Sequence, residues 1–467
     1  FVWLNFWTVV MSVLDFEDTP FEAPLVQKEA VHDTSLFIKK HTRSSDNEWS
    51  YNQTKGQGGR VRLITFFFLV SCSFLNAPIM SVAVLAMSSQ FGWTAEAMGY
   101  LHSGFFYGFG GTQIIGGVIA DRFGGKLSIS IGVLGMSLFL LVTPLAAQFL
   151  PVLVLIRVLM GLSEGVQSPS VHNLVAHWFP LSERNLALAL IRSGGYAGMA
   201  FAYLAAPEIV DKYGWDKIWY LFGALGVAWF LCFSVSGAST PAEHKSIGLE
   251  ELQHIEETAE TDSAAQIPWK QFFGSSAFWA VVAAHFCHDW GWYTMVNWMP
   301  TYYHSLGVTS EQSSWYSAVP FFVNLPSTAL AGATADYCVR KHYSLLHIRR
   351  LFTCLGMLVP AVCYALTNVV ESPEYALLLI CTAFSFDAFN VGGYLINNID
   401  IGPKYAGSIK GVSDTVGCCA GVLSNTITGL CVFCTGRYDT VFIVIACFKV
   451  VGAVVFCILA HDKVVFK

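Results

Sequence analysis

The 467-residue sequence predicts an all-α, polytopic membrane protein whose twelve transmembrane helices form two pseudo-symmetric six-helix halves. Three observations lead to this fold class: a shortage of charge, twelve long apolar runs, and a motif that occurs once in each half. Asp, Glu, Lys and Arg make up only 12% of the chain, while hydrophobic residues make up 54%. Soluble domains carry about 25% charge, and the mean hydropathy here is +0.52. This composition excludes a disordered chain, a nucleic-acid-binding protein that relies on basic patches, and an ordinary soluble enzyme.

Apolar runs of about twenty residues cross a bilayer as helices, because lipid offers no partner to backbone polar groups. The fourth run carries Arg157 and Glu164, and we expect Pro320 and Pro326 to break the eighth. The twelve runs cover approximately 63–87, 98–120, 127–147, 150–172, 187–207, 218–238, 277–298, 315–334, 351–368, 375–396, 408–430 and 440–460.

Polar segments divide the chain into four parts. Residues 1–60 form a polar N-terminal segment that we expect to be cytosolic and partly disordered, and residues 61–238 form the first half. Residues 239–276 form a cytosolic linker with an acidic helix at 248–260, and residues 277–467 form the second half. The apolar start FVWLNFWTVV is too short to span and does not begin with Met, so we interpret it as a fragment or gene-model artefact rather than a signal peptide.

The distribution of basic residues predicts the orientation, because Lys and Arg collect in cytosolic loops. Nine lie in even-to-odd loops and three in odd-to-even loops, which places both termini and the linker in the cytosol. The thirteen cysteines lie mostly inside apolar runs, where Cys packs as a small hydrophobe. CVFC at 431–434 has no second pair or His cluster, so we predict no metal site.

A repeated motif predicts a gate at the cytosolic helix ends. GVIADRFGGK follows the second run and GATADYCVRK follows the eighth, so both halves carry Gly-x-x-x-Asp and a closing basic residue. A carboxylate beside a basic cluster can brace neighbouring helices, whereas loop orientation alone would explain only the basic residues. The predicted gating residues are Gly117, Asp121, Arg122, Gly124, Gly125, Lys126, Gly332, Asp336, Arg340 and Lys341.

This repeat resembles the major facilitator superfamily, in which two six-helix halves surround a midplane site. Longer stretches are similar to its anion:cation symporters: RVLMGLSEGVQSPSVHNLVAHWFPLSER at 157–184, HFCHDWGWYTMVNWMPTYY at 285–303 and NNIDIGPKYAG at 397–407. That family includes sodium–phosphate transporters, vesicular glutamate transporters, sialin and plant plastid phosphate transporters. The CHDWG and WMPTYY segments look most like its plant and protist branch.

Charges inside the membrane are the first candidates for function, because an unpaired charge in lipid costs several kcal/mol. Arg157 and Glu164 lie seven residues apart and therefore on one face of a helix. An Arg fork suits an anion, and a Glu in low dielectric can exchange a proton. The resemblance implies these roles for the two residues; a structural ion pair with other helices is the alternative. The eight charges within the runs are Arg157, Glu164, Arg192, Asp289, Asp387, Lys410, Asp414 and Lys449.

Two histidines are implicated by the resemblance. His102 occupies a position where the family carries a functional His, so it is a candidate for proton coupling, with packing as the alternative. His288 lies where relatives carry Arg or His, so we expect it to face the substrate. Adjacent helical residues diverge by about 100° and are not expected to point both at one site, so we place His288 toward the cavity and leave the role of Asp289 open.

The first helix lacks a cation that the family usually has, because Ala77 takes its position. Arg192 then either supplies the missing charge or is a structural residue paired with a carboxylate such as Asp387. Tyr196 is a candidate for lining the site. Asp387 is either part of a proton or sodium site or a residue that hydrogen-bonds between helices.

Two further charges are expected to have structural partners. Lys410 and Asp414 are four residues apart and are expected to pair locally. Lys449 lies midway along the last run, so we expect either snorkelling or a structural partner.

These residues predict a secondary transporter that moves a small anion by alternating access. Inorganic phosphate or an organic carboxylate is the expected substrate, with H⁺ or Na⁺ as coupling ion and no cofactor. A neutral or zwitterionic solute is the first alternative, motivated by Ala77, and a transport-dead sensor or scaffold is the second. We expect a monomer in a lipid bilayer that is not an enzyme; plasma, vesicular and plastid membranes all remain open.

Overall fold

The computed structural model describes residues 60–75, 79–179, 181–248, 251–252, 255, 268–370, 372–402, 405–461 and 464–466. These residues form α-helices and short 3-10 turns, and no strand occurs among them, which confirms the all-α prediction. Ala77, the N-terminal segment up to residue 59 and most of the expected acidic helix lie outside the described residues.

The first half contains six helical spans. The first is made of α3 and α4 and the fourth of α7 and α8, which are separated only at Val166. The bounds are α3 Arg60–Leu75, α4 Ile79–Phe91, α5 Ala95–Phe123, α6 Gly125–Ala146, α7 Leu150–Gly165, α8 Gln167–Trp178, α9 Leu181–Tyr213 and α10 Trp215–Ser236.

The second half repeats this arrangement after a linker that contains the 3-10 turn η1, Pro241–Glu243, and the short helix α12, Trp269–Gly274. The bounds are α13 Ser276–Ser305, α14 Ser310–Arg340, α15 Leu345–Leu366, η2 Thr367–Val369, α16 Pro373–Asp387, η3 Ala388–Gly392, α17 Tyr394–Ile401, α18 Ala406–Thr435 and α19 Asp439–Leu459. Together α16, η3 and α17 make one span.

The expected break in the eighth span is wrong, because α14 runs through both Pro320 and Pro326. Transmembrane helices tolerate proline where neighbouring groups satisfy the freed carbonyls. The carbonyl oxygens that these two prolines leave without a helical N–H partner are those of Tyr316 and Phe322, four residues before each proline.

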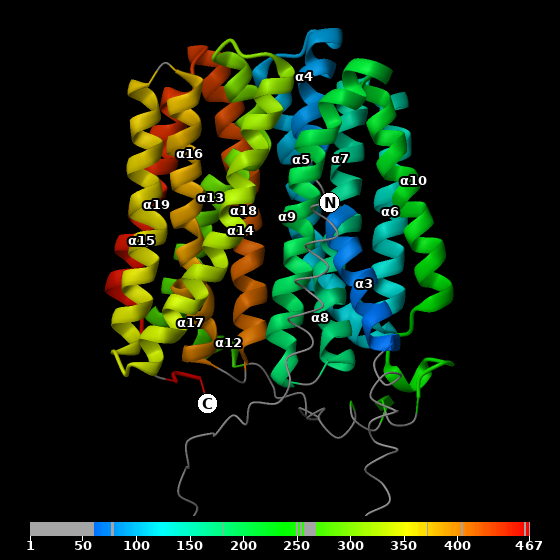
Figure 1. Ribbon diagram of the computed structural model, residues 1–467, viewed down its shortest axis with the longest axis vertical. Helices are drawn as coiled ribbons and strands as arrows, with labels where there is room; N and C mark the ends of the chain where they lie inside the picture. Colours follow the sequence, from blue (N-terminus) through cyan, green and yellow to red (C-terminus); the bar gives the residue numbers. More distant parts are fainter. Residues whose placement is uncertain are drawn as a thin grey trace, which may run out of the picture. The chain divides into compact units, whose positions relative to one another are not determined.

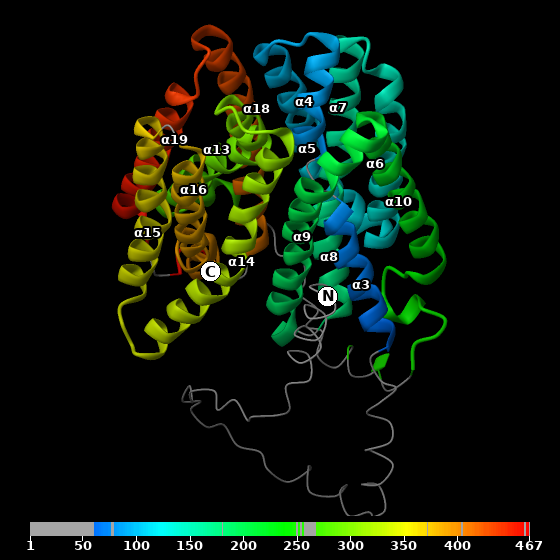
Figure 2. The ribbon, with the colours of Figure 1, turned by 45° about the horizontal axis from the view of Figure 1, so that its top comes forward.

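Seven of the described helical spans are long and apolar enough to cross a membrane by length and hydropathy alone. The long helices α5, α9, α13 and α14 are less apolar, and each packs against a helix of the opposite half. Because they face the other half rather than only lipid, they carry polar and small residues. In Figures 1 and 2, α3–α10 lie together on one side and α13–α19 on the other.

The helix ends define two faces. We call the end where α10 finishes at Ser236 and α13 begins at Ser276 the linker face, at the bottom of Figure 1. The opposite end, where α9 meets α10 and α13 meets α14, is the far face. Toward the far face the two halves touch: the Ser103 hydroxyl is 2.8 Å from that of Thr426, and a Cβ added at Gly99 would lie 3.1 Å from the Gly429 Cα.

Part of the predicted gate lies at the linker face. Gly124 has φ +89°, a conformation that favours glycine, and joins α5 to α6. The Lys126 ammonium donates to the Ser234 carbonyl oxygen at 2.9 Å, which ties α6 to the end of α10. Gly125 packs closely on α8, whereas a Cβ at Gly332 would meet open space. Arg122, Arg340 and Lys341 are exposed, Gly117 is half-buried, and the side chains of Asp121 and Asp336 lie outside the described part.

Candidate substrate and proton site

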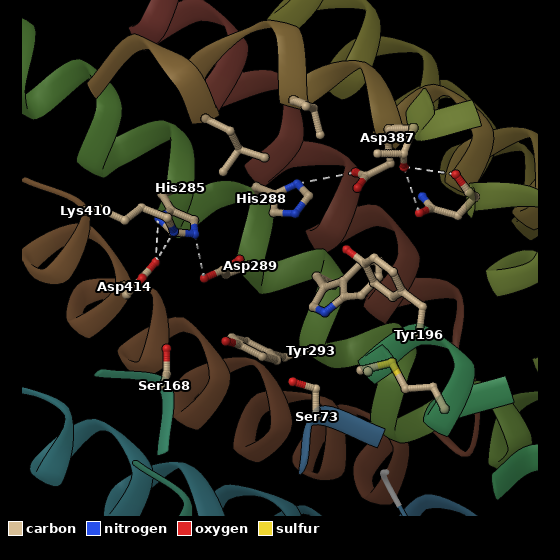
Figure 3. A pocket seen from close by; sticks show the side chains of 18 of the residues that line it. Ser73, Ser168, Tyr196, His285, His288, Asp289, Tyr293, Asp387, Lys410 and Asp414 are labelled. Atoms are coloured by element: carbon tan, nitrogen blue, oxygen red, sulfur yellow. Dashed lines mark hydrogen bonds and ion pairs between the residues drawn. The ribbon is translucent and has the colours of Figure 1, made fainter. Parts of the chain in front are cut away.

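A cavity of about 380 Å³ lies between the halves and reaches toward the linker face. The first half contributes Glu164 from the end of α7, together with polar and aromatic side chains such as Ser73, Gln113 and Tyr196. The second half contributes most of the charge (Figure 3), and its charged or ionisable lining residues are His285, His288, Asp289, Asp387, Lys410 and Asp414.

The contacts around this cavity describe a state open to the linker face. The side chains of Lys410 and Asp414, close to the start of α18 at that face, are 21% and 29% exposed. On the opposite side, the Tyr203 hydroxyl of α9 donates to the Val296 carbonyl oxygen of α13 at 2.5 Å. Tyr203 also stacks on Phe321 of α14, with ring centroids 5.6 Å apart.

One group of charges, the His288 triad, consists of His288, Asp387 and Lys449. Lys449 is 1% exposed and forms an ion pair with Asp387, so the expectation of a structural partner for Lys449 is met. His288 Nδ1 lies 3.4 Å from Asp387 Oδ1 and 3.4 Å from Lys449 Nζ. Asn390 holds the end of α16 by donating to the carbonyl oxygens of Gly356 at 3.0 Å and Asp387 at 2.9 Å.

A second group, the His285 tetrad, consists of His285, Asp289, Lys410 and Asp414. Lys410 and Asp414 pair one helical turn apart, as expected. His285 lies between the two carboxylates, as Figure 3 shows, with Nε2 3.4 Å from Asp289 Oδ2 and Nδ1 3.6 Å from Asp414 Oδ1. Its Nδ1 is also 2.6 Å from the Ser413 hydroxyl.

The expectation that two adjacent residues of this helix cannot both point at one site is wrong, because His288 and Asp289 both line the cavity. The reason is geometric: the cavity follows a wide sector of α13, so residues about 100° apart both border it. Sequence reasoning also missed His285. The signal was present, since His285 and Asp289 are four residues apart on one helix and so lie on one face.

Arg157 lies in a separate chamber of about 140 Å³ on the far side of Glu164. Glu164 borders both spaces, together with Tyr293 and Trp292. Arg157 is 7% exposed, and its guanidinium donates from Nε to the Leu101 carbonyl oxygen at 3.2 Å and lies 5.1 Å from the Phe105 ring centre. Among the described residues Glu164 forms no ion pair.

The remaining candidates lie at different depths. His102 is fully buried beside Trp298, at 5.5 Å between ring centres, and neither ring nitrogen has a hydrogen-bond partner among the described residues. Tyr196 lines the cavity and contacts Trp292 across the halves at 6.0 Å between ring centres. Arg192 lies on α9, and its side chain, on which the predicted role depends, lies outside the described part.

The family assignment follows from a sequence comparison. Residues 66–425 match the model of the Major Facilitator Superfamily. The chain belongs to this superfamily. Solved structures of similar fold include a bacterial homologue of the human lysosomal transporter Spinster, in an inward-facing and occupied conformation, with a TM-score of 0.69 at 16% identity over 89% of this chain and 97% of that one. A D-xylose–proton symporter has a TM-score of 0.67 at 14% identity over 86% of this chain and 97% of that one.

Curated relatives from this superfamily match most of the chain. One is named probable anion transporter 4, chloroplastic, from Oryza sativa subsp. japonica, 35% identical over 87% of this chain and 69% of the relative. The ascorbate transporter, chloroplastic, from Arabidopsis thaliana is 34% identical over 86% and 74%. Sialin from Ovis aries is 32% identical over 92% and 84%. These matches confirm the resemblance to the anion-transporter branch.

Proposed function

We propose that this superfamily member moves a small organic anion across a membrane by alternating access, together with protons. The observation that carries the proposal is the charge balance of the cavity and the adjoining chamber. Their described side chains hold four carboxylates, Glu164, Asp289, Asp387 and Asp414, against three permanent cations, Arg157, Lys410 and Lys449.

An anion that entered this site would add negative charge to a region in which carboxylates already outnumber cations by one. If Arg192 is counted as a fourth cation, the numbers of cations and carboxylates become equal and the site still has no excess positive charge. An uncompensated charge in a buried site costs several kcal/mol, so a carboxylate has to take up a proton when the anion binds. Proton uptake with the anion is therefore the coupling that this arrangement favours over sodium.

The lining favours an organic anion over inorganic phosphate. Tyr196, Trp292, Tyr293 and Tyr394 place aromatic surface around a cavity of about 380 Å³. Aromatic surface recognises the apolar body of an organic molecule, while a few charged groups fix its orientation. A phosphate ion would use only the charged groups and leave the aromatic surface without a partner.

The roles proposed for individual residues follow their positions. Arg157 attracts the anion, His288 and Tyr196 contact it, and Glu164 carries a proton between chamber and cavity. Position 192 lies on the same helical face as Gly195, Tyr196 and Met199, which line the cavity, so Arg192 is proposed to replace the cation absent at Ala77. His102 is buried on α5 next to Leu101, whose carbonyl oxygen accepts a hydrogen bond from Arg157. From this position His102 is proposed to modulate the binding of the coupling proton at Glu164.

A panel of solutes in proteoliposomes tests the proposal. Ascorbate, sialic acid, glutamate, inorganic phosphate and uncharged glucose are offered under imposed pH, sodium and voltage gradients. We expect an organic acid to accumulate with the pH gradient and without sodium. Accumulation driven only by sodium would contradict proton coupling, and a preference for phosphate would contradict the organic substrate.

Two variants connect the panel to the site. Arg157→Ala is expected to abolish uptake while the protein remains folded and inserted, and normal uptake would overturn the role of Arg157. Glu164→Gln is expected to abolish accumulation by a pH gradient but to keep exchange of labelled for unlabelled anion. Lys217→Gln, on an exposed side chain at the far face, is the matched control and should change neither activity.

A zwitterionic solute is the second candidate, because Lys410 and Lys449 are each already paired with a carboxylate. Paired charges of both signs can bind a solute that carries both. Uptake of a zwitterion in preference to every anion of the panel would favour this candidate.

The chain is proposed to work with its linker face in the cytosol. Protease protection of the linker in sealed vesicles tests this orientation.

A further inference from the structure

We infer that His285 and Asp289 hold one transported proton between them, in a site on the second half that is distinct from Glu164. This inference deepens the proposed function and rests on it, because the proton crosses the membrane only if the protein works as a transporter. The occupancy of the site by a proton is a separate claim, argued from the geometry of the His285 tetrad.

The two histidines of α13 allow a direct comparison. In the His288 triad one Asp faces one Lys, so the triad is neutral when His288 is neutral. In the His285 tetrad two carboxylates, Asp289 and Asp414, face one ammonium group, Lys410. With His285 neutral the tetrad therefore carries one negative charge too many, and a single proton removes the excess.

Among the described ionisable groups that act on Asp289, the one cation outside the tetrad, Lys449, is already paired with Asp387. Beyond the tetrad, the described ionisable groups that act on Asp289 include a second acid–base pair whose charges cancel. These neighbours are Lys449 of α19, Asp387 of α16, Tyr293 of α13 and Cys418 of α18, with Tyr394 of α17 beside the His285 ring. Around Asp289 the described side chains thus present three Asp against two Lys, and the extra Asp is Asp289 itself, because Asp414 pairs with Lys410 and Asp387 pairs with Lys449.

Asp289 is held in place against a neighbouring helix. A Cβ added at Gly417 of α18 would lie 2.1 Å from Asp289 Oδ2, so only glycine leaves room for this carboxylate. The carboxylate of Asp289 therefore lies against the backbone of α18. Its side chain is 9% exposed and that of His285 is 8%, so an ionised Asp289 would be a poorly solvated charge.

The tetrad also provides a route from water to Asp289. Asp414 is 29% exposed at the cavity, and His285 faces Asp414 with Nδ1 and Asp289 with Nε2. A proton that binds at Nδ1 makes an imidazolium, and release of the proton at Nε2 to Asp289 leaves a neutral imidazole and a neutral carboxyl group. One proton enters and one is delivered, so the step balances without a further reactant.

The two proton sites lie on opposite walls of one cavity. Glu164 belongs to α7 of the first half and Asp289 to α13 of the second, and Tyr293 lines the cavity with both. Each half therefore contributes one proton-binding carboxylate. This predicts two protons moved for each anion, one with Glu164 and one with the His285–Asp289 pair.

Infrared difference spectroscopy on the full chain in membranes tests proton occupancy directly, through the absorption of protonated carboxyl groups as pH is varied without any solute. In addition to the signal of its exposed carboxylates, the wild-type protein should show two titrating bands from carboxyl groups that line the cavity. Asp289→Asn should remove one and Glu164→Gln the other. The matched control Lys410→Gln/Asp414→Asn removes one charge of each sign and should keep the Asp289 band.

An Asp289→Asn spectrum identical to that of the wild type would overturn the inference. Asp289→Glu keeps the carboxyl group and should shift the frequency of the same band. This variant replaces Asp289→Asn if Asp289→Asn does not fold. A band that does not shift in Asp289→Glu overturns the inference. Labelled ascorbate provides the transport readout: Asp289→Asn should lose about tenfold in accumulation for each unit of pH gradient. If no solute moves, the proposed function fails while the infrared result still decides proton occupancy.

Discussion

Tyr203 of α9 donates a hydrogen bond of 2.5 Å to the main-chain carbonyl oxygen of Val296 on α13, and so joins the two halves on the far side of the cavity. Alternating access requires this contact to break when the far face opens. Its strength therefore sets part of the balance between the two states.

Replacement of Tyr203 by Phe should shift the protein toward states open at the far face. Interhelical hydrogen bonds in membranes contribute about 0.6 kcal/mol on average, which corresponds to a shift of about threefold. Hydrogen exchange of the peptide 294–305 at the far end of α13 should become faster. Tyr303→Phe is the matched control, because the buried Tyr303 hydroxyl has no hydrogen-bond partner among the described residues. Equal exchange in both variants would contradict the prediction.

The Lys449–Asp387 pair should be costly to break on one side only. Lys449→Met leaves a buried carboxylate, Asp387, whose other ion-pair partner among the described residues is His288. Loss of one member of a buried pair costs about 3–5 kcal/mol. Thermal unfolding of the purified protein should show this loss, and Lys449→Met/Asp387→Asn should recover most of it.

The exposed pair Lys217–Asp216 is the control for that experiment, because its side chains are 54% and 33% exposed. Exposed ion pairs contribute little, so Lys217→Met should leave the unfolding temperature almost unchanged. A double variant no more stable than Lys449→Met would show that the two charges do not act as a pair.

Two glycines should respond differently to the same substitution. A Cβ at Gly161 of α7 would lie 1.9 Å from the Phe105 carbonyl oxygen of α5, so Gly161→Ala should force these helices apart. Overpacking costs about 1–3 kcal/mol, and the yield of folded protein should fall. Gly332→Ala meets open space and should keep the folded yield, since Ala favours helix by about 1 kcal/mol. A loss of transport by a stable Gly332→Ala variant would support the gating role predicted from the repeat.

Neutralisation of Arg192 should weaken anion binding if this residue replaces the cation absent at Ala77. A charge-assisted contact is worth about 1.5–3 kcal/mol, so Arg192→Gln should raise the concentration for half-maximal uptake roughly tenfold to a hundredfold. Lys212→Gln, on the same helix with a side chain 64% exposed, is the control. An unchanged half-maximal concentration for Arg192→Gln would leave Arg192 a structural role.

Features that depend on local spacing could be predicted from the sequence. Apolar runs located the spans, and Lys410 and Asp414 could be paired because they are one turn apart. The partner of Lys449 could not be named, since Asp387 is distant along the chain and meets it only through the packing of α16 and α19. His285 could not be predicted in this way, because the family resemblance implicated only His102 and His288, and a histidine acquires its role from its neighbours, here including Asp414 on α18. The break expected at Pro320 and Pro326 does not occur, because transmembrane helices packed against other helices tolerate proline better than helices in water do.

The contact of Asp289 with Gly417 has an evolutionary consequence. Because a Cβ at position 417 would lie 2.1 Å from the Asp289 carboxylate oxygen, any larger residue there requires that carboxylate to be lost or moved. Homologous chains with an acid at the equivalent of 289 should therefore keep glycine at the equivalent of 417. Homologous chains with a smaller, uncharged residue at the equivalent of 289 are free to vary at the equivalent of 417. The two positions, one on α13 and one on α18, should have changed together during divergence.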